Sequence, residues 1–309
     1  FQFPNIDPGT PVKLDIDLVS HSVNNNSTFI VNANGNTMSV QDDKVGNHYT
    51  SIYGDKTNIT MNFNTSNPQI NVEINFTQGN SSCLAWLNKI KVRSRRLLKM
   101  SGNQMKFRDL TSVATGNTAQ FQIGNTSTNA IIWDITNPIN PIEQLTNNSN
   151  NQVTFNAESE TLKEYIIYNG NYFKEPISHG LVKTQNLHKL KDEHPQYIII
   201  TPPQFKIQAE NLAQFHREND GLTSVVATTS QIYNEFSSGA QDIVAIRSFI
   251  KMFYDEAIND EQLPKYVLMF GDGSYDYKNR ITGNTNFVPV YQSNNSLDPT
   301  ASYASDDFF

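Results

Sequence analysis

The spacing of apolar residues changes near residue 185, and this change constrains the fold more than any other feature. Before it, apolar and polar residues alternate, as they do from Val12 to Leu18. Such alternation predicts strands with one packed and one wet face, which is typical of antiparallel sheets. Asn-rich turns, for example Asn34-Gly35-Asn36, separate these strands. We therefore predict an antiparallel β-sandwich domain over residues 1–190.

After residue 190 the pattern changes to continuous apolar runs that alternate with helical patterns. Tyr197-Ile198-Ile199-Ile200 is such a run, and it fits a strand that is covered on both faces. The expected elements are strands at 197–200, 222–227, 266–270 and 287–291, with helices around 209–216 and 243–253. This order predicts a parallel α/β sheet. We assign residues 191–309 to the incomplete first part of an α/β domain, and we expect more chain to follow in the natural protein.

Composition excludes several classes of function. The net charge of −7 gives no general attraction to nucleic acid or to an anionic membrane surface. No apolar run approaches the roughly 18 residues of a membrane span. The sequence opens Phe1-Gln2-Phe3-Pro4 without a leader, which indicates a processed exported protein or an excerpt of a longer one. The single cysteine, Cys83, excludes an internal disulfide and a multi-cysteine metal site.

A polar loop directly follows the predicted strand 266–270. In open α/β sheets, ligands bind beyond the carboxyl ends of the strands, and Gly271-Asp272-Gly273-Ser274-Tyr275-Asp276 lies at such an end. Asp272 either caps backbone N–H groups, the interpretation that the residue types favour, or belongs to a ligand site. Asp272 and Asp276 could also help bind calcium, although the EF-hand spacing is absent. Ser274 lacks the Gly-x-Ser-x-Gly context of an elbow nucleophile.

Cys83 is the only candidate thiol nucleophile. A cysteine peptidase needs its thiolate beside a histidine. The sequence offers His179-Gly180, but this pair lies in the predicted linker before the α/β sheet. We therefore favour Cys83 as a buried structural residue over a Cys83/His179 pair.

Two charged segments allow two interpretations each. Basic residues alternate with apolar ones along one predicted strand, at Lys89, Lys91, Arg93 and Arg95. They form either a solvated face that pairs with acidic neighbours, which we favour, or a contact for an anionic glycolipid or an acidic partner. Near the C-terminus, Asp306 and Asp307 belong either to a surface loop or to the wall of a substrate cleft, where carboxylates hold a cation or a basic side chain.

The segment Tyr266–Asn279 resembles the signature loop of the gingipain-type cysteine peptidases. Phe287–Ser293 and Ser302–Phe309 narrow the resemblance to the sortases of the type IX secretion system. The similarity covers residues 84–309 and is dense from residue 197 onward.

This resemblance implies a caspase-like α/β fold and a His/Cys dyad. The family's histidine, in a His-Gly context, and its cysteine both follow the Asp-Asp-aromatic segment. We therefore expect both to lie beyond residue 309, no catalytic residue in this chain, and no peptidase activity of the chain alone. Asp272, Asp306 and Asp307 are the candidates for lining the substrate cleft. No cofactor is implied beyond a structural calcium.

By the same resemblance, the parent protein would be an exported cysteine endopeptidase and transpeptidase at the cell surface. It would cut the C-terminal sorting domain from exported cargo proteins and join the cargo to an anionic lipopolysaccharide. Its partners would be other outer-membrane components of the secretion system, and not nucleic acid. The alternative is a non-enzymatic docking or adhesion module with a degenerate peptidase-like domain.

Overall fold

The structure, a computed structural model, describes residues 1–170, 172–182 and 184–309. The chain divides into two compact units, Phe1–Ser178 and His179–Phe309. The first unit is built of antiparallel sheets, and the second is built around a parallel sheet flanked by helices. The predicted fold class is therefore confirmed. The border that we predicted at residue 190 stays a prediction.

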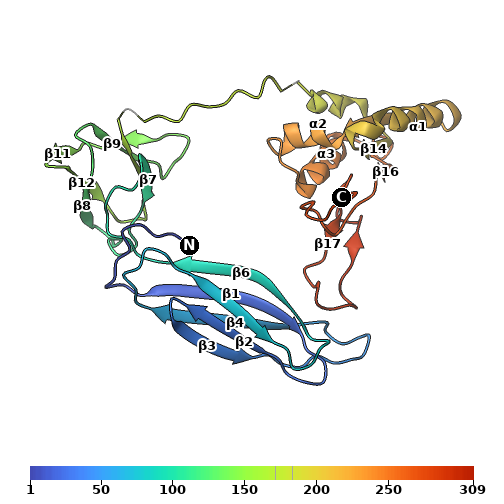
Figure 1. The fold of residues 1–309 in the computed structure, drawn as a ribbon. Coiled ribbons are helices and arrows are strands. Elements are labelled where there is room, and N and C mark those ends of the chain that lie inside the picture. The colour runs from blue at the N-terminus through green and yellow to red at the C-terminus, as the bar shows by residue number, and fades with distance from the viewer. Residues whose placement is uncertain (171, 183) are drawn as a thin grey trace. The chain divides into compact units, whose positions relative to one another are not determined.

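The first unit begins with a β sandwich of two three-stranded antiparallel sheets (Figure 1). The strand order is β4-β1-β6 in one sheet and β3-β2-β5 in the other. The strands are β1 (Val12–His21), β2 (Thr28–Ala33), β3 (Asn36–Gln41), β4 (Asp55–Phe63), β5 (Val72–Thr77) and β6 (Leu84–Arg93). The inward residues Leu14 and Ile16 of β1 pack in one core with Phe29 and Val31 of β2. The alternation in the sequence thus reports the packed face correctly.

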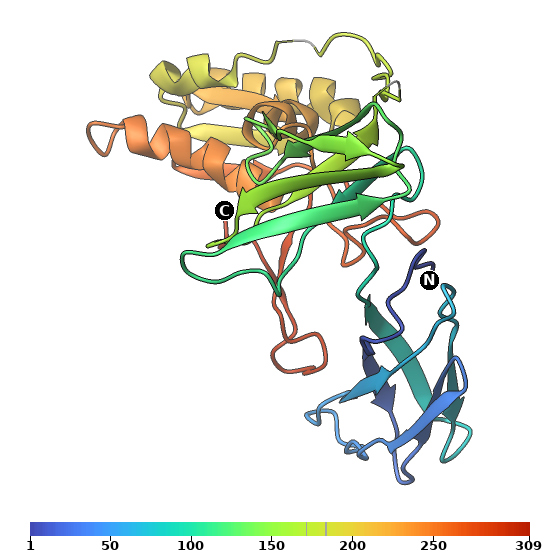
Figure 2. The ribbon, with the colours of Figure 1, turned by 90° about the vertical axis from the view of Figure 1, so that its left-hand side faces the viewer.

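A second β sandwich follows in the same unit, and Figure 2 shows its strands in green. Its sheets have the orders β10-β9-β13-β7 and β11-β12-β8. The strands are β7 (Gln104–Phe107), β8 (Thr118–Gly124), β9 (Ala130–Asp134), β10 (Ile142–Glu143), β11 (Asn147–Ser149), β12 (Gln152–Glu158) and β13 (Tyr165–Asn169). In its core Phe121 stacks on Phe155 with ring centroids 5.1 Å apart, and Tyr165 meets the Phe155 ring edge to face at 5.1 Å. Burial, together with the nearby charge of Asp134, raises the pKa of Tyr165 to about 12.

The sequence predicted one β-sandwich domain for this region, whereas the structure contains two separate hydrophobic cores. The buried residues of the first core end at Ile70 and those of the second begin at Met100. Alternation identifies which face of a strand is packed, but it does not identify which sheets face one another. The number of cores was therefore not accessible from the pattern.

The second unit is an α/β layer structure around the parallel sheet β15-β14-β16. Its elements are η1 (Leu187–Glu193), β14 (Tyr197–Thr201), η2 (Pro203–Phe205), α1 (Lys206–Asn219), β15 (Ser224–Thr228), α2 (Thr229–Phe236), α3 (Ile243–Glu256), β16 (Tyr266–Met269), β17 (Tyr291–Gln292) and β18 (Ala304–Ser305). Ile199 of β14 packs with Ala213 of α1 on one face, and Ile200 packs with Phe249 of α3 on the other. Because both faces are covered, the strand is buried at every position and its centre, Ile198–Ile200, is wholly aliphatic.

Two details of this unit differ from the sequence prediction. Helix α2 was not predicted, although Thr228 and Gln231 form a capping box at its start. The expected strand 287–291 does not join the parallel sheet. Instead, the N–H groups of Phe287 and Val288 both donate to the carbonyl of Asp272, and only Tyr291–Gln292 forms a strand, which pairs with β18. Val288 is buried in the core beside α3, which accounts for its apolar character.

The start of the second unit is held by the side chain of Glu235 in α2. Its two carboxylate oxygens accept the backbone N–H groups of Leu187 and His188 at 2.8 Å each. The His188 ring also bonds to this carboxylate and stacks on Phe236, with centroids 4.6 Å apart. Burial raises the pKa of Glu235, but the N–H donors of His188 and Leu187 outweigh burial, so the pKa lies below its ordinary value.

We expect Glu235→Gln to lower the free energy of unfolding of the α/β unit by about 1 kcal/mol at pH 7, because charged hydrogen bonds are replaced by neutral ones. Since the folded pKa is depressed, the carboxylate contributes stability above its unfolded value of 4.5 and loses it as the pH falls through the folded pKa. The difference between wild type and variant should therefore shrink below pH 4. Thermal unfolding, followed by the helical circular dichroism signal from pH 7 to pH 3, measures it. A constant difference over this range would contradict the prediction.

Among the described residues, no helix is both long and apolar enough to cross a membrane.

Candidate functional site

The candidate site lies at the carboxyl end of β14 and β16. The N–H of Phe270 donates to the carbonyl of Ile200 at 2.7 Å, and the Thr201 hydroxyl donates to the carbonyl of Phe270 at 3.1 Å. These bonds hold the end of β14 beside the residues that follow β16. Asp272 follows two residues later, so the strand direction places it at the ligand-binding edge of the sheet.

The two glycines beside Asp272 are required by packing. A Cβ atom at Gly271 would lie 3.1 Å from the Cβ of Phe287, and the φ angle of +156° at Gly271 favours glycine. A Cβ atom at Gly273 would lie only 2.5 Å from a methyl group of Val290. The backbone of the loop at Gly271 and Gly273 therefore packs against side chains of the segment 287–290. This contact fixes the position of Asp272, which lies between the two glycines.

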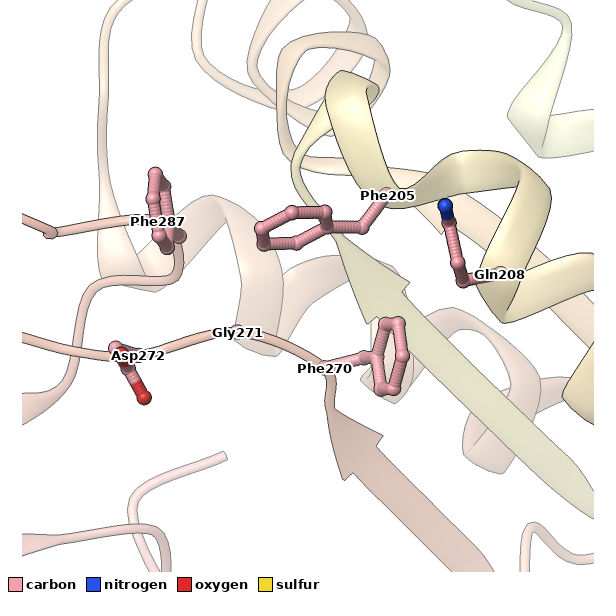
Figure 3. A pocket seen from close by; sticks show the side chains of 6 residues that line it. All are labelled: Phe205, Gln208, Phe270, Gly271, Asp272 and Phe287. Atoms are coloured by element: carbon pink, nitrogen blue, oxygen red, sulfur yellow. The ribbon is translucent and has the colours of Figure 1, made fainter.

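A hollow of about 360 Å³ lies next to this loop (Figure 3). Its lining comes from η2, the start of α1, the end of β16 and the segment after the loop: Phe205, Gln208, Phe270, Gly271, Asp272 and Phe287. The Phe205 ring meets the Phe287 and Phe270 rings edge to face, at centroid distances of 5.2 Å and 6.4 Å. Figure 3 shows the carboxylate of Asp272 pointing away from the Phe287 ring, at the border of the hollow. The hollow is therefore apolar, with two polar side chains at its border.

The other polar residues of the loop are engaged in turn structure. Asp276 accepts the N–H of Ile281 at 2.7 Å, and Ser274 Oγ accepts the N–H of Asp276 at 3.1 Å. In the part of the chain that the structure describes, no group of three or more histidine, cysteine or acidic side chains could hold a metal ion. Calcium binding by Asp272 and Asp276 stays a prediction.

Asp306 and Asp307 are exposed and do not line the hollow. They are nevertheless connected to its loop. The Gln292 amide in β17 donates to the carbonyl of Ser274 at 3.1 Å, and β17 pairs with β18, which directly precedes Asp306. The following aromatics are packed: Phe308 stacks on Tyr291 at 5.1 Å. The acidic pair thus lies on an anchored segment. Its place in a common cleft with Asp272 stays a prediction.

Cys83 is fully buried in the first unit, and His179 is exposed. Burial raises the pKa of the Cys83 thiol, but hydrogen bonds from the hydroxyls of Ser27 and Ser22 and from backbone N–H groups leave it below the ordinary value. A lowered pKa does not make this thiol a nucleophile, because substrate cannot reach it and its partners are hydroxyls and backbone. The geometry favours the structural interpretation of Cys83.

The basic strand β6 lies beside the acidic strand β1. Lys89 forms an ion pair with Asp17 at 2.8 Å, and Arg93 forms one with Asp15. Beyond the strand, Arg95 pairs with Asp109 at 2.9 Å. These ion pairs support the interpretation of a solvated face whose basic side chains pair with acidic neighbours. Little unpaired positive charge is left on this face to bind an anionic glycolipid.

Comparison with known proteins links this geometry to a family. Residues 190–309, which include β14, β16 and the whole hollow, match the family model described as peptidase family C25. The α/β unit is therefore similar to peptidase family C25 over these residues. No curated protein sequence matches the chain.

A solved structure extends the likeness to the whole chain. The crystal structure of dimeric latent PorU from Porphyromonas gingivalis matches all of this chain with a TM-score of 0.82 and 23% sequence identity. The chain spans 30% of the length of that PorU chain. The two β sandwiches and the α/β unit thus share the fold of part of PorU, and the gingipain-type resemblance seen in the sequence is confirmed.

Three of the six residues that line the hollow were not expected from the sequence. Phe205 and Gln208 come from the η2–α1 junction, and Phe287 comes from a segment that was expected to be a strand. One signal was present in the sequence: Phe205 stands two residues after Pro203, close to the carboxyl end of the first buried strand. Side chains at that position meet those that follow the neighbouring parallel strand.

Proposed function

We propose that this chain is part of a cysteine peptidase that resembles the type IX secretion sortase. In this proposal the parent protein removes the C-terminal sorting domain from exported cargo and joins the cargo to an anionic lipopolysaccharide at the cell surface. It works with outer-membrane components of the same system. The observation that carries the proposal is the match to the C25 family model over residues 190–309, together with the PorU-like fold over the entire chain.

In this proposal the C25 domain supplies one wall of the substrate cleft, and the reacting groups come from outside these 309 residues. The positions of Cys83 and of the loop with Asp272 support this proposal. The one thiol, Cys83, is enclosed in the first β sandwich, whereas the loop with Asp272 stands at the open carboxyl edge of the parallel sheet. Asp272, Asp306 and Asp307 shape the cleft and do not take part in proton transfer or nucleophilic attack.

The expected result is that the chain 1–309 does not cleave peptides that span a cargo sorting junction, while the parent protein does. Alkylation of accessible thiols should inactivate the parent. Cys83→Ala should leave its rate unchanged within about twofold, because substrate cannot reach the buried thiol. Product formation followed by mass spectrometry measures both proteins.

Two outcomes would contradict the proposal. Loss of the parent's cleavage in Cys83→Ala, with folding intact, would make Cys83 the nucleophile. A folded parent that neither cleaves nor transfers any sorting-junction peptide would support the non-enzymatic docking module instead.

A further inference from the structure

Aromatic rings gather on the outer face of the first β sandwich, at one end of the sheet β4-β1-β6. His21 ends β1, Trp86 stands near the start of β6, and Tyr53 belongs to the loop before β4. The Tyr53 ring stacks on His21 with centroids 4.4 Å apart and meets the Trp86 ring at 6.1 Å. We call these three residues the aromatic platform. Trp86 and Tyr53 are 43% and 44% exposed, so both leave aromatic surface in water for a ligand to cover.

The pairing of the strands brings a lysine to the same face. Val19 of β1 pairs with Trp86 on one side and with Lys56 of β4 on the other, so the three side chains form one row across the sheet. The residues before and after Val19 in β1 are buried, and side chains alternate between faces, so this row points outward. The aromatic platform and the Lys56 ammonium therefore stand on one surface of the sheet.

Tyr53 is fixed in place although it lies in a loop. His21 Nδ1 is 2.6 Å from the backbone carbonyl oxygen of Tyr53. Because a carbonyl can only accept, Nδ1 carries the proton and donates it to this bond. At the other end of the loop, the N–H of Val45 donates to the carbonyl of Ser22 at 3.0 Å. A ring that is already held in position loses less conformational entropy when a ligand binds.

The polar atoms of this surface are hydrogen-bond donors that lack acceptors. Within the described residues, the indole N–H of Trp86, the hydroxyl of Tyr53 and the ammonium of Lys56 have no hydrogen-bond partner and no ion pair. Lys89 on the same face differs, because it pairs with Asp17. A fitting ligand must therefore offer several acceptors next to an apolar face. The unpaired lysine also disfavours a protein as the occupant, since the cores of protein interfaces are depleted in lysine.

We propose that the aromatic platform binds an oligosaccharide of neutral pyranose units. The C–H groups on one face of a pyranose pack against the rings of Trp86 and Tyr53, whose faces carry negative partial charge. The hydroxyl oxygens at its edge accept from the indole N–H, the Tyr53 hydroxyl and Lys56. An aliphatic chain would leave these donors without acceptors, and a small anion would leave the rings in water. This inference concerns the first β sandwich and does not depend on the peptidase function.

The test uses the chain 1–309 with Trp133→Phe, so that Trp86 is the one remaining tryptophan. The probes are cellohexaose, β-1,4-linked mannohexaose and maltohexaose, three neutral chains that differ in shape. We expect at least one of them to bind with a Kd of about 1 mM or below. Binding should move the Trp86 emission to shorter wavelength, and the affinity should not change with salt concentration, because the ligand carries no charge. Fluorescence titration and calorimetry measure both effects.

Three variants locate the binding, and calorimetry compares them. Trp86→Ala should weaken binding roughly tenfold or more, because a ring that covers the sugar is lost. Tyr53→Phe keeps the ring and removes only the hydroxyl, so a loss of about threefold is expected, and Lys56→Ala should show a similar loss. Lys91→Ala is the matched control, because Lys91 is exposed on β6 of the same sheet but lies in the row of Asp15. It should leave the affinity unchanged.

The proposal is overturned if none of the three oligosaccharides binds, if a folded Trp86→Ala variant binds as well as wild type, or if Lys91→Ala weakens binding as much as Lys56→Ala does. It is also overturned if light scattering shows that Trp86→Ala dissociates a dimer, since a second copy of the chain would then cover the platform. Cleavage is not measured in any of these experiments. Their failure would leave the peptidase function standing, and a parent protein without peptidase activity would leave this inference standing.

Discussion

Asp42→Ala is expected to lower the free energy of unfolding of the first β sandwich by about 3 kcal/mol. Asp42 is 1% exposed and has no basic partner. Its carboxylate accepts the Ser22 hydroxyl and the backbone N–H of Ser27, each at 2.5 Å. Removal of the carboxylate leaves the N–H of Ser27 enclosed without an acceptor and leaves the Ser22 hydroxyl with only the Ser27 hydroxyl, 2.8 Å away, as a partner. An enclosed donor without an acceptor costs about 1–3 kcal/mol. The hydroxyls of Ser22 and Ser27 also form hydrogen bonds with Cys83, so the variant should loosen the packing around the thiol.

Urea unfolding followed by tryptophan fluorescence measures this effect. Trp86 reports on the first β sandwich, and a Trp133→Phe background removes the signal of the second. The control is Asp43→Ala, because Asp43 is adjacent but exposed, and it should change stability by less than about 0.5 kcal/mol. An Asp42→Ala variant as stable as the control would show that water replaces the carboxylate at no cost. In the folded variant, Cys83 should react faster with thiol reagents than it does in wild type.

The order of elements in the α/β unit was predictable because each pattern had one physical cause. The run Tyr197-Ile198-Ile199-Ile200 is apolar throughout since α1 covers one face of β14 and α3 covers the other. In the same way, the spacing of Phe249 and Phe253 on α3 follows from the single face that this helix buries. Helix α2 escaped prediction because it spans only eight residues, too few for periodicity to stand out.

The candidate site was predictable only in part. Asp272 was identified because an apolar strand ends just before it, and strand direction then fixes the edge of the sheet. That strand, β16, was expected to be buried, but Tyr266 and Val267 are exposed and Leu268 and Met269 are only half-buried. Phe205 and Phe287 come from segments on either side of this loop in sequence, and their meeting depends on how the chain packs after residue 286. This packing is set by hydrogen bonds from the backbone N–H groups of Phe287 and Val288 to the carbonyl of Asp272. Backbone hydrogen bonds outside regular strands require no particular residue types, so the sequence does not reveal them.

Gly273→Ala is expected to lower the free energy of unfolding of the α/β unit by about 2 kcal/mol. The new Cβ would stand 2.5 Å from a Val290 methyl group and 3.1 Å from the carbonyl oxygen of Val288. The first contact is far below van der Waals distance, so the loop or the 287–290 segment must move, and overpacking of this kind typically costs 1–3 kcal/mol. The movement would also displace Phe287 and reshape the hollow.

A double-mutant cycle with Val290→Ala identifies the cause. Val290→Ala removes the methyl group that collides, so Gly273→Ala should cost less in that background than in wild type, with a coupling of about 1 kcal/mol. Thermal unfolding followed at 222 nm reports on this unit, since α1, α2 and α3 all lie within it. Additive effects would mean that the collision with Val290 is relieved elsewhere. In that case Gly273 would be required by the shape of its own turn, and the single variant should keep the NMR shifts of Phe287 unchanged.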